Sequence, residues 1–343
     1  MMETVWPRRL ALIALVLAVI VITKGGFTRI TDSGLGCPDW PGCFGEMVMP
    51  TDTERLSYLQ ERYPEIHVAA HKGWIEMIHR YLATFLGVII VALAYFGIRY
   101  RGVPHYPSKT SLLLLGLVML QGAFGMWTVT MKLLPIIVTI HLMGGLIILS
   151  TLMYLRARLR QAASGVGVGT PAKRWVLGGI LVLFMQMALG GWVSTNYAGW
   201  ACPSLLSCAA GVDVPYDFKA GFEIETEIGP NYEGGQLALE ARAAIQMVHR
   251  VGAFIVIGYW AALLIWLARR NPSVQSRCQV MAGLLAGQVV LGYANVVYAV
   301  PDALAFGHHV LAVLLVIAAW QFVFDTDEQG EVLHGSLGRP QPA

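Results

Sequence analysis

Charged residues are scarce in this sequence. Only 13% of its 343 residues are Asp, Glu, Lys or Arg, whereas 56% are hydrophobic and the mean hydropathy is +0.59. A soluble domain carries about 25% charged residues, so this composition excludes an ordinary soluble protein. The net charge is only +3 and forms no basic patch suited to nucleic acid. The sequence therefore predicts a membrane protein.

Long polar stretches are also few, because apolar segments occupy most of the chain. These segments are residues 7–28, 74–98, 111–131, 133–155, 175–196, 243–268, 280–300 and 302–324. Each is long enough for a helix to cross about 30 Å of hydrocarbon. The first segment contains Arg8 and Arg9 at its start, as a signal peptide would. However, it is followed by "TKGGFTR" rather than by a small-residue cleavage site, so we interpret this segment as an anchor helix. We expect an all-α integral membrane protein with eight transmembrane helices.

Acidic residues are nearly absent from alternate helix ends, where basic residues gather. The basic residues concerned are Arg8, Arg9, Arg99, Arg101, Lys109, Arg156, Arg158, Arg160, Lys173, Arg174, Arg269, Arg270 and Arg277. The opposite loops, 31–70 and 197–242, are long and rich in Asp and Glu. The positive-inside rule therefore predicts that both termini are cytoplasmic and that both long loops lie outside. We expect a multi-pass protein of the plasma membrane.

Cysteine is rare, and four of the five cysteines fall in these outer loops as two pairs. Cys37 and Cys43 lie in "SGLGCPDWPGC", and Cys202 and Cys208 lie in "AGWACPSLLSC". Because the outer side is oxidising, we expect disulfides Cys37–Cys43 and Cys202–Cys208. A metal site is the alternative, but no loop histidine spacing completes one. Cys278, at a cytoplasmic helix end, is expected to be a free thiol.

The two cysteine loops belong to a longer internal repeat. "EMIHRYLATFLG" at 76–87 matches "QMVHRVGAFIVIG" at 246–258, and "HLMGGLIIL" at 141–149 matches "HHVLAVLLV" at 308–316, with offsets between 165 and 170. Such self-similarity indicates two copies of one unit. Since both copies begin on the cytoplasmic side, we expect two pseudo-symmetric, parallel four-helix bundles. The expected domains are 1–155 (N-terminal bundle), 156–174 (cytoplasmic linker), 175–325 (C-terminal bundle) and 326–343 (cytoplasmic tail).

Histidines lie near the outer ends of the second and fourth helix of each unit. They are His79 and His141 in the first unit and His249 and His308 in the second. Polar groups in hydrocarbon are costly and usually functional, and two facing imidazoles are suited to hold a haem iron. The alternative is four core histidines bonded between helices; zinc is disfavoured because no third ligand lies nearby. His309 adjoins His308, and the repeat offset favours His308 without settling the choice.

Arg80 and Arg250 each follow one of these histidines at the outer membrane boundary. Haem propionates need cations at that depth, so both are candidates to bind them. Arginines that simply extend to the membrane surface are the alternative, with equal weight.

The two units differ at one chemically important position. Glu76 stands three residues before His79, whereas Gln246 stands three before His249. Residues i and i+3 share a helix face, so Glu76 points toward the same pocket as its histidine. A carboxylate there is able to act as a base or to stabilise a developing cation. The alternative is an interfacial Glu76 paired with Arg80 or Lys72.

These residues together resemble a known family. "GGFTRITDSGLGCPDWPGC", "EMIHR", "QMVHR" and the paired histidines are similar to haem A synthases with cysteines in their outer loops. The resemblance implies oxidation of the C8 methyl group of haem O to a formyl group, giving haem A for terminal oxidases. It implies Glu76 as the catalytic residue, His79 and His141 as ligands of the substrate haem, and a b-type haem cofactor on His249 and His308. "HHVLA" departs from the family's usual His-Gln.

The resemblance also implies partners. These are haem O and the enzyme that supplies it, membrane lipid, and an electron acceptor that the sequence does not identify. The sequence does not decide between a monomer and a homo-oligomer. It also does not identify the source of the inserted oxygen or assign a redox role to the disulfides. The main alternative function is a di-haem b-type membrane cytochrome that carries electrons from quinol. A transporter built from parallel repeats is a more distant one.

Overall fold

The protein is all-helical in a computed structural model that describes residues 5–161, 171–204, 208, 215–224, 227–270 and 272–336. Within these residues, the only β-type pairing is an isolated bridge between Cys43 and Glu46. Eight helices are long and apolar enough to cross a membrane. They are α1 (Val5–Ile30), α3 (Ala70–Arg99), α4 (Ser108–Thr130), α5 (Pro135–Gln161), α6 (Pro171–Thr195), α8 (Leu239–Arg270), α9 (Gln275–Val297) and α10 (Asp302–Ser336). The predicted multi-pass helical membrane protein is confirmed.

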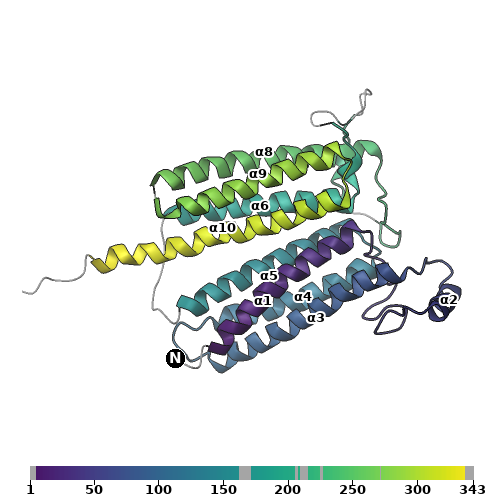
Figure 1. The fold of residues 1–343 in the computed structure, drawn as a ribbon, viewed down its shortest axis with the longest axis horizontal. Helices are drawn as coiled ribbons and strands as arrows, with labels where there is room; N and C mark the ends of the chain where they lie inside the picture. Colours follow the sequence, from purple (N-terminus) through teal and green to yellow (C-terminus); the bar gives the residue numbers. More distant parts are fainter. Residues whose placement is uncertain are drawn as a thin grey trace, which may run out of the picture.

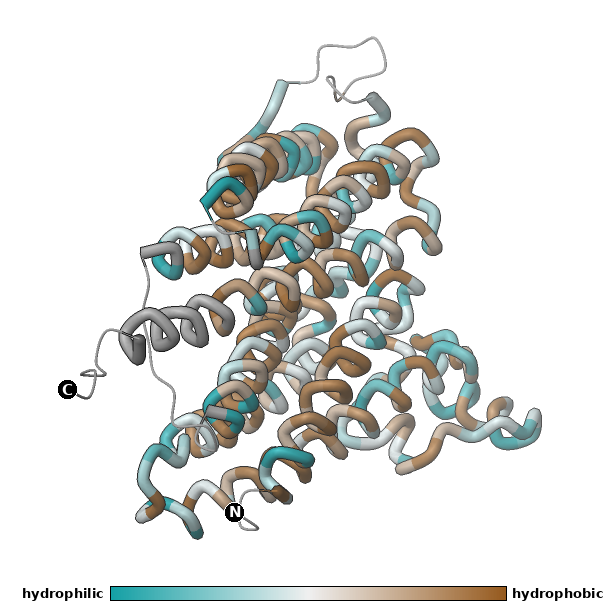
Figure 2. The backbone as a smooth tube through the Cα atoms, turned by 60° about the vertical axis from the view of Figure 1, so that its left-hand side comes forward, coloured by the Kyte–Doolittle hydropathy of each residue, from teal (hydrophilic) through white to brown (hydrophobic). Residues whose placement is uncertain are grey.

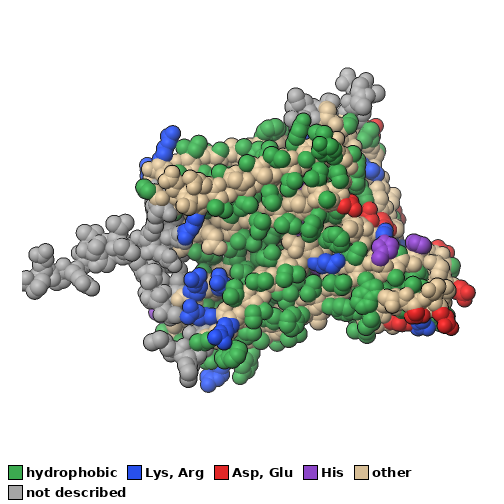
Figure 3. Space-filling model, viewed as in Figure 1, with side chains coloured by type: hydrophobic (Ala, Val, Ile, Leu, Met, Phe, Trp, Pro, Cys, Tyr) green, Lys and Arg blue, Asp and Glu red, His purple; other side chains and the backbone are tan. Residues whose placement is uncertain are grey.

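The membrane helices are apolar on their outer faces as well as inside. Phe85, Val88 and Phe254 are more than half exposed, which suits contact with lipid rather than water. A helix pairs its backbone groups internally, as hydrocarbon demands. In Figure 2 hydrophobic residues run along the helices and hydrophilic ones collect toward the ends and loops. On the face in Figure 3, basic side chains gather at one end of the bundles and acidic ones at the other.

The eight helices pack in two groups of four (Figure 1). In the first, α1 packs against α3 and α5, and α4 closes the ring between them. In the second, α6 packs against α8 and α10, and α9 closes the ring. Each group has its own apolar core, around Leu93 and Leu149 in the first and around Trp260 and Met281 in the second. The groups meet where α5 contacts α6 and α10, and where α1 contacts α10.

The outer loops contain short helices that sequence analysis did not predict. They are α2 (Thr53–Arg62) and α7 (Phe218–Gly221). Asp52 caps α2 by accepting a hydrogen bond from the Arg55 N–H at 2.8 Å. The α2 side chain Leu59 is buried with Cys37 and Met77. The first loop is therefore folded onto the start of α3.

The helices also extend beyond the predicted segments. α5 continues to Gln161 and α6 begins at Pro171, so both ends of the expected linker 156–174 are helical. Residues 162–170, its centre, lie outside the described part of the chain. α10 runs on to Ser336, into the segment expected as a tail.

Candidate functional site

Both outer-loop disulfides form as predicted. Cys37 bonds Cys43, and Cys202 bonds Cys208, with S–S distances of 1.98 and 1.96 Å. Cys278 is a buried free thiol. Within the described ranges, no three His, Cys, Asp or Glu side chains come together as a metal cluster. The cysteines thus fasten the loops.

Each disulfide lies over the first turns of the second membrane helix of its group. The Cys37 sulfur is 3.8 Å from the Gly73 carbonyl oxygen of α3, and the Cys208 sulfur is 3.9 Å from that of Ala243 in α8. Gly73 and Ala243 occupy equivalent positions in the sequence repeat. The two loops therefore cover the same region of each group.

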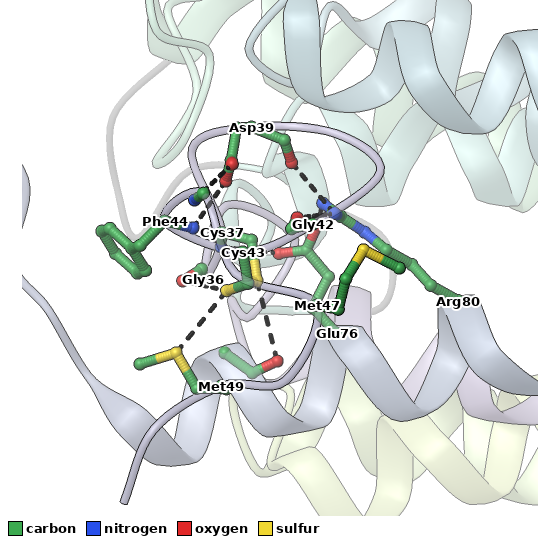
Figure 4. The surroundings of a disulfide bond; sticks show 12 residues. Gly36, Cys37, Asp39, Gly42, Cys43, Phe44, Met47, Met49, Glu76 and Arg80 are labelled. Atoms are coloured by element: carbon green, nitrogen blue, oxygen red, sulfur yellow. Dashed lines mark hydrogen bonds and ion pairs between the residues drawn. A yellow bond between two sulfur atoms is a disulfide. The ribbon is translucent and has the colours of Figure 1, made fainter.

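Glu76 lies beneath the first disulfide loop, with only 4% of its surface exposed. Its Oε2 accepts a hydrogen bond from the Cys37 backbone N–H at 2.9 Å, and its Oε1 pairs with the Arg80 guanidinium one turn along α3. Figure 4 shows the carboxylate between the loop and Arg80. Lys72, the other candidate partner, lies 3.9 Å from Glu233 instead. Both carboxylate oxygens are thus held in place.

Arg80 and Arg250 bind the backbone of the loops. The Arg80 guanidinium donates to the carbonyl oxygens of Asp39 (2.9 Å), Pro41 (3.2 Å) and Gly42 (2.5 Å). That of Arg250 donates to the carbonyl oxygens of Ser204 (2.6 Å) and Cys202 (3.0 Å). Sequence reasoning missed this anchoring role, since the loop carbonyls are brought to the helices only by folding. Propionate binding by either arginine stays a prediction.

Gln246 lies where Glu76 would be in the second group. It is 6% exposed, and its Oε1 finds no hydrogen-bond partner among the described residues. The fully paired carboxylate of the first group is thus replaced by an amide whose oxygen has no partner in the described part of the chain.

The four predicted histidine ligands all lie against glycines of a neighbouring helix in their own group. The pairs are His79 with Gly25, His141 with Gly125, His249 with Gly190, and His308 with Gly292. A Cβ added at Gly25 would lie 2.9 Å from the His79 ring, and at the other three glycines 3.2 to 3.3 Å from the ring. The glycines therefore make room for the imidazoles.

His308 and His309 face different parts of the protein. His308 points to Gly292 of α9, in the manner that His141 points to α4. His309 points across to α1, where its Nε2 lies 3.1 Å from the Ile22 carbonyl oxygen. A Cβ at Gly26 would lie only 2.3 Å from the His309 ring. His308 thus belongs to the interior of its own group and His309 to the contact between the groups.

Several imidazole nitrogens are buried without a partner. The Nδ1 atoms of His79, His141 and His308 find no hydrogen-bond partner within the described ranges of the chain. Buried polar atoms are normally paired, because leaving them unpaired costs free energy. These orphaned nitrogens and the glycine-backed rings fit a flat metal complex held between two imidazoles.

Glutamines near the histidines were missed as site residues. Two of them, Gln121 and Gln288, begin the segments "QGAFG" at 121–125 and "QVVLG" at 288–292, which are related by the same offset of 167 residues as His141 and His308. Gln121 donates to the His141 carbonyl oxygen at 2.7 Å. Gln288 Nε2 lies 3.2 Å from His308 Nε2, and Gln186 Nε2 lies 3.1 Å from His249 Nδ1.

The outer ends of α1 and α6 are joined beside these sites. The Arg29 guanidinium pairs with Asp32 at 3.1 Å, donates to the Ser194 carbonyl oxygen at 2.5 Å and covers the Tyr197 ring at 4.2 Å. The Tyr197 hydroxyl donates to Asp32 at 2.8 Å. Burial raises the pKa of Tyr197, so this hydroxyl keeps its proton. These contacts fix the two groups to each other on the loop side.

The chain is similar to known proteins over nearly its whole length. Residues 8–320 match the COX15-CtaA family model, described as a cytochrome oxidase assembly protein. The chain is 40% identical to the heme A synthase of Shewanella oneidensis over 322 residues, which cover 92% of this chain and 94% of the relative. It is 28% identical to the heme A synthase of Rhizorhabdus wittichii, with 90% of each chain covered. Identity to that of Brucella anthropi is 26%, with 89% of this chain and 88% of the relative covered.

Proposed function

Because this chain belongs to the COX15-CtaA family of cytochrome oxidase assembly proteins, we propose that it is a haem A synthase. It oxidises the C8 methyl group of haem O to a formyl group and so makes haem A for terminal oxidases. The observation that carries the proposal is the full-length match to a relative of that name at 40% identity. The paired histidines and the single buried Glu76 fit the same reaction.

Two haems fit the histidine pairs. His79 and His141 would hold the substrate haem O in the N-terminal bundle, and His249 and His308 a resident b-type haem in the C-terminal bundle. The support is that His308 faces its own bundle and that three of the four Nδ1 atoms are unpaired. Bound haem iron supplies the redox chemistry. The protein supplies the ligands, sets the depth of the haem in the membrane and provides the surrounding dipoles.

Glu76 is the proposed catalytic residue. It lies one helical turn from His79, and the Cys37 amide and Arg80 orient its two oxygens. Oxidation of a methyl group releases protons, and a positioned carboxylate is able to accept them or to stabilise positive charge near the reacting carbon. Gln246 offers neither a negative charge nor a basic oxygen. We therefore assign the reaction to the N-terminal bundle and electron transfer to the C-terminal one.

The proposed setting is the plasma membrane, with both termini in the cytoplasm and the disulfide loops outside. The separation of basic and acidic side chains supports this orientation (Figure 3). The proposed pseudo-symmetry is supported by matching contacts between the groups. In the repeat, α1 corresponds to α6 and α5 to α10, and the contact of α1 with α10 matches that of α6 with α5. The proposed partners are the enzyme that supplies haem O, lipid and an electron acceptor.

The test is expression in cells that make haem O but lack their own haem A synthase. Extracted haems are separated and identified by mass. We expect haem A to appear with this chain and not with an empty vector. A di-haem cytochrome fed by quinol would contain b-type haem alone, and that result would replace the proposal with the alternative.

A further inference from the structure

Part of the first outer loop, residues 39–49, folds into a tight hairpin. The Cys43 N–H donates to the Glu46 carbonyl oxygen at 2.7 Å, and the Glu46 N–H donates to the Cys43 carbonyl oxygen at 3.1 Å. The Asp39 carboxylate accepts hydrogen bonds from the backbone N–H groups of the two turn residues, at 2.6 and 2.7 Å (Figure 4). These bonds give the 39–49 hairpin a defined shape.

The 39–49 hairpin buries some of its apolar side chains and exposes others. Cys43 and Met49 are buried, and Met49 packs against the start of α3. Met47 and Val48 are 66% and 56% exposed, and Trp40 is 46% exposed. Neighbouring apolar side chains with this much exposure mark a surface that contacts lipid or another protein.

The hairpin is attached to α3 at the depth where the hydrocarbon begins. The Tyr81 hydroxyl donates to the Met47 carbonyl oxygen at 2.5 Å, and Arg80 binds three further carbonyl oxygens of the hairpin. Tyr81 is 18 residues from Arg99, the basic end of α3, which corresponds to about 27 Å of helix. The hydrocarbon of a bilayer is about 30 Å thick. With Arg99 at one boundary of the hydrocarbon, Tyr81 and the hairpin lie at the other.

The exposed side of the hairpin continues the lipid-facing stripe of α3. The exposed side chains of this stripe recur at helical spacing and are Ile78, Tyr81, Phe85 and Val88. Because the Tyr81 hydroxyl bonds Met47, the hairpin meets the outer end of the stripe. Trp and Tyr side chains are enriched at this depth of a membrane.

The charged side chains of the hairpin are held by other partners. Glu46 accepts a hydrogen bond from Arg55 Nε of helix α2 at 2.7 Å. Asp39 is occupied by the amides of the turn. Helix α2, with the sequence TERLSYLQER, is polar and lies on the water side of the loop. Neither carboxylate therefore has to enter lipid with Met47 and Val48.

We propose that the 39–49 hairpin is inserted into the lipid leaflet on the loop side of the membrane. Met47 and Val48 contact lipid at the boundary between head groups and acyl chains. Since Arg80 joins the hairpin carbonyls to the Glu76 carboxylate, the bilayer holds the loop closed over Glu76. This inference goes beyond the proposed function, because insertion into lipid requires no turnover.

The test uses the full-length protein in phospholipid nanodiscs. Val48→Trp and Met47→Trp each add an indole to the exposed side of the hairpin, and Ser57→Trp adds one to α2 of the same loop. Met119→Trp, on the exposed face of α4, is the lipid-facing reference. The fluorescence added relative to the wild type is quenched with phospholipids brominated on their acyl chains and, separately, with iodide in the water.

We expect brominated lipid to quench the two hairpin indoles several-fold more strongly than the indole of Ser57→Trp, and iodide to give the reverse order. Hairpin indoles that iodide quenches as strongly as that of Ser57→Trp would lie in water, and this result would overturn the proposal. Shielding from both quenchers would mean that a protein surface, such as a second copy of the chain, covers the hairpin, which would overturn it as well. If one hairpin variant does not fold, the other decides.

Discussion

The Cys37 backbone N–H donates a hydrogen bond to Glu76 Oε2 at 2.9 Å, across 39 residues of sequence. The residue that closes the first disulfide therefore also orients the proposed catalytic carboxylate. In the second bundle, Gln246 Oε1 has no partner among the residues that the structure describes. The disulfide loop of the first bundle is thus part of the proposed active site, whereas that of the second has no carboxylate to hold.

Replacing Glu76 by Gln should abolish most conversion of haem O to haem A. The amide keeps the shape of the side chain and copies Gln246, but it loses the charge and the ion pair with Arg80. The variant should fold and keep the C-terminal haem. The ratio of haem O to haem A in cells that supply haem O measures this, with Gln246→Ala as the control that keeps conversion. Abundant haem A from Glu76→Gln would end the catalytic assignment.

Opening the first disulfide should impair conversion more than opening the second. Cys43→Ser frees the loop whose Cys37 amide holds Glu76, whereas Cys208→Ser frees a loop that holds no carboxylate. Loss of a disulfide typically costs about 2–5 kcal/mol, so both variants should melt at lower temperature. Conversion per folded protein separates the two effects. Equal conversion by both variants would contradict a link between the first loop and Glu76.

His308→Ala should remove the low-spin b-type spectrum, because bis-imidazole ligation is lost. His309→Ala should keep that spectrum and lower stability by about 1 kcal/mol, since it removes a hydrogen bond to the Ile22 carbonyl between the bundles. Absorption spectra and thermal unfolding of both variants measure this. Loss of the haem in His309→Ala but not in His308→Ala would reverse the assignment.

Arg250→Gln should release the second loop from α8, because the Arg250 guanidinium binds the carbonyl oxygens of Cys202 and Ser204. We expect limited proteolysis to cut the loop several-fold faster than in the wild type. Arg269→Gln is the control on the same helix, because Arg269 lies in the last turn of α8, at the end opposite the loop. Faster haem loss with unchanged loop protection would mean that Arg250 serves the propionates alone.

The sequence by itself predicted the membrane-spanning segments, the internal repeat, the two disulfide pairs and the four histidines that are candidate haem ligands. Each of these is visible in the order of residues alone: an apolar run long enough to cross a bilayer, an offset that stays between 165 and 170 residues, or a short spacing on the oxidising side. Glu76 was proposed as a site residue in the same way, since its contrast with Gln246 is visible in the aligned repeats.

Tertiary structure alone decided which groups those residues touch. The Cys37 amide reaches Glu76, Arg80 binds loop carbonyls, His309 turns to Ile22, and Gln186 contacts His249. Each contact joins segments whose approach depends on how helices pack and how a loop folds back on them. Helix α2 was missed as well, because a short polar helix on a loop gains its stability from packing on neighbouring segments rather than from its own sequence.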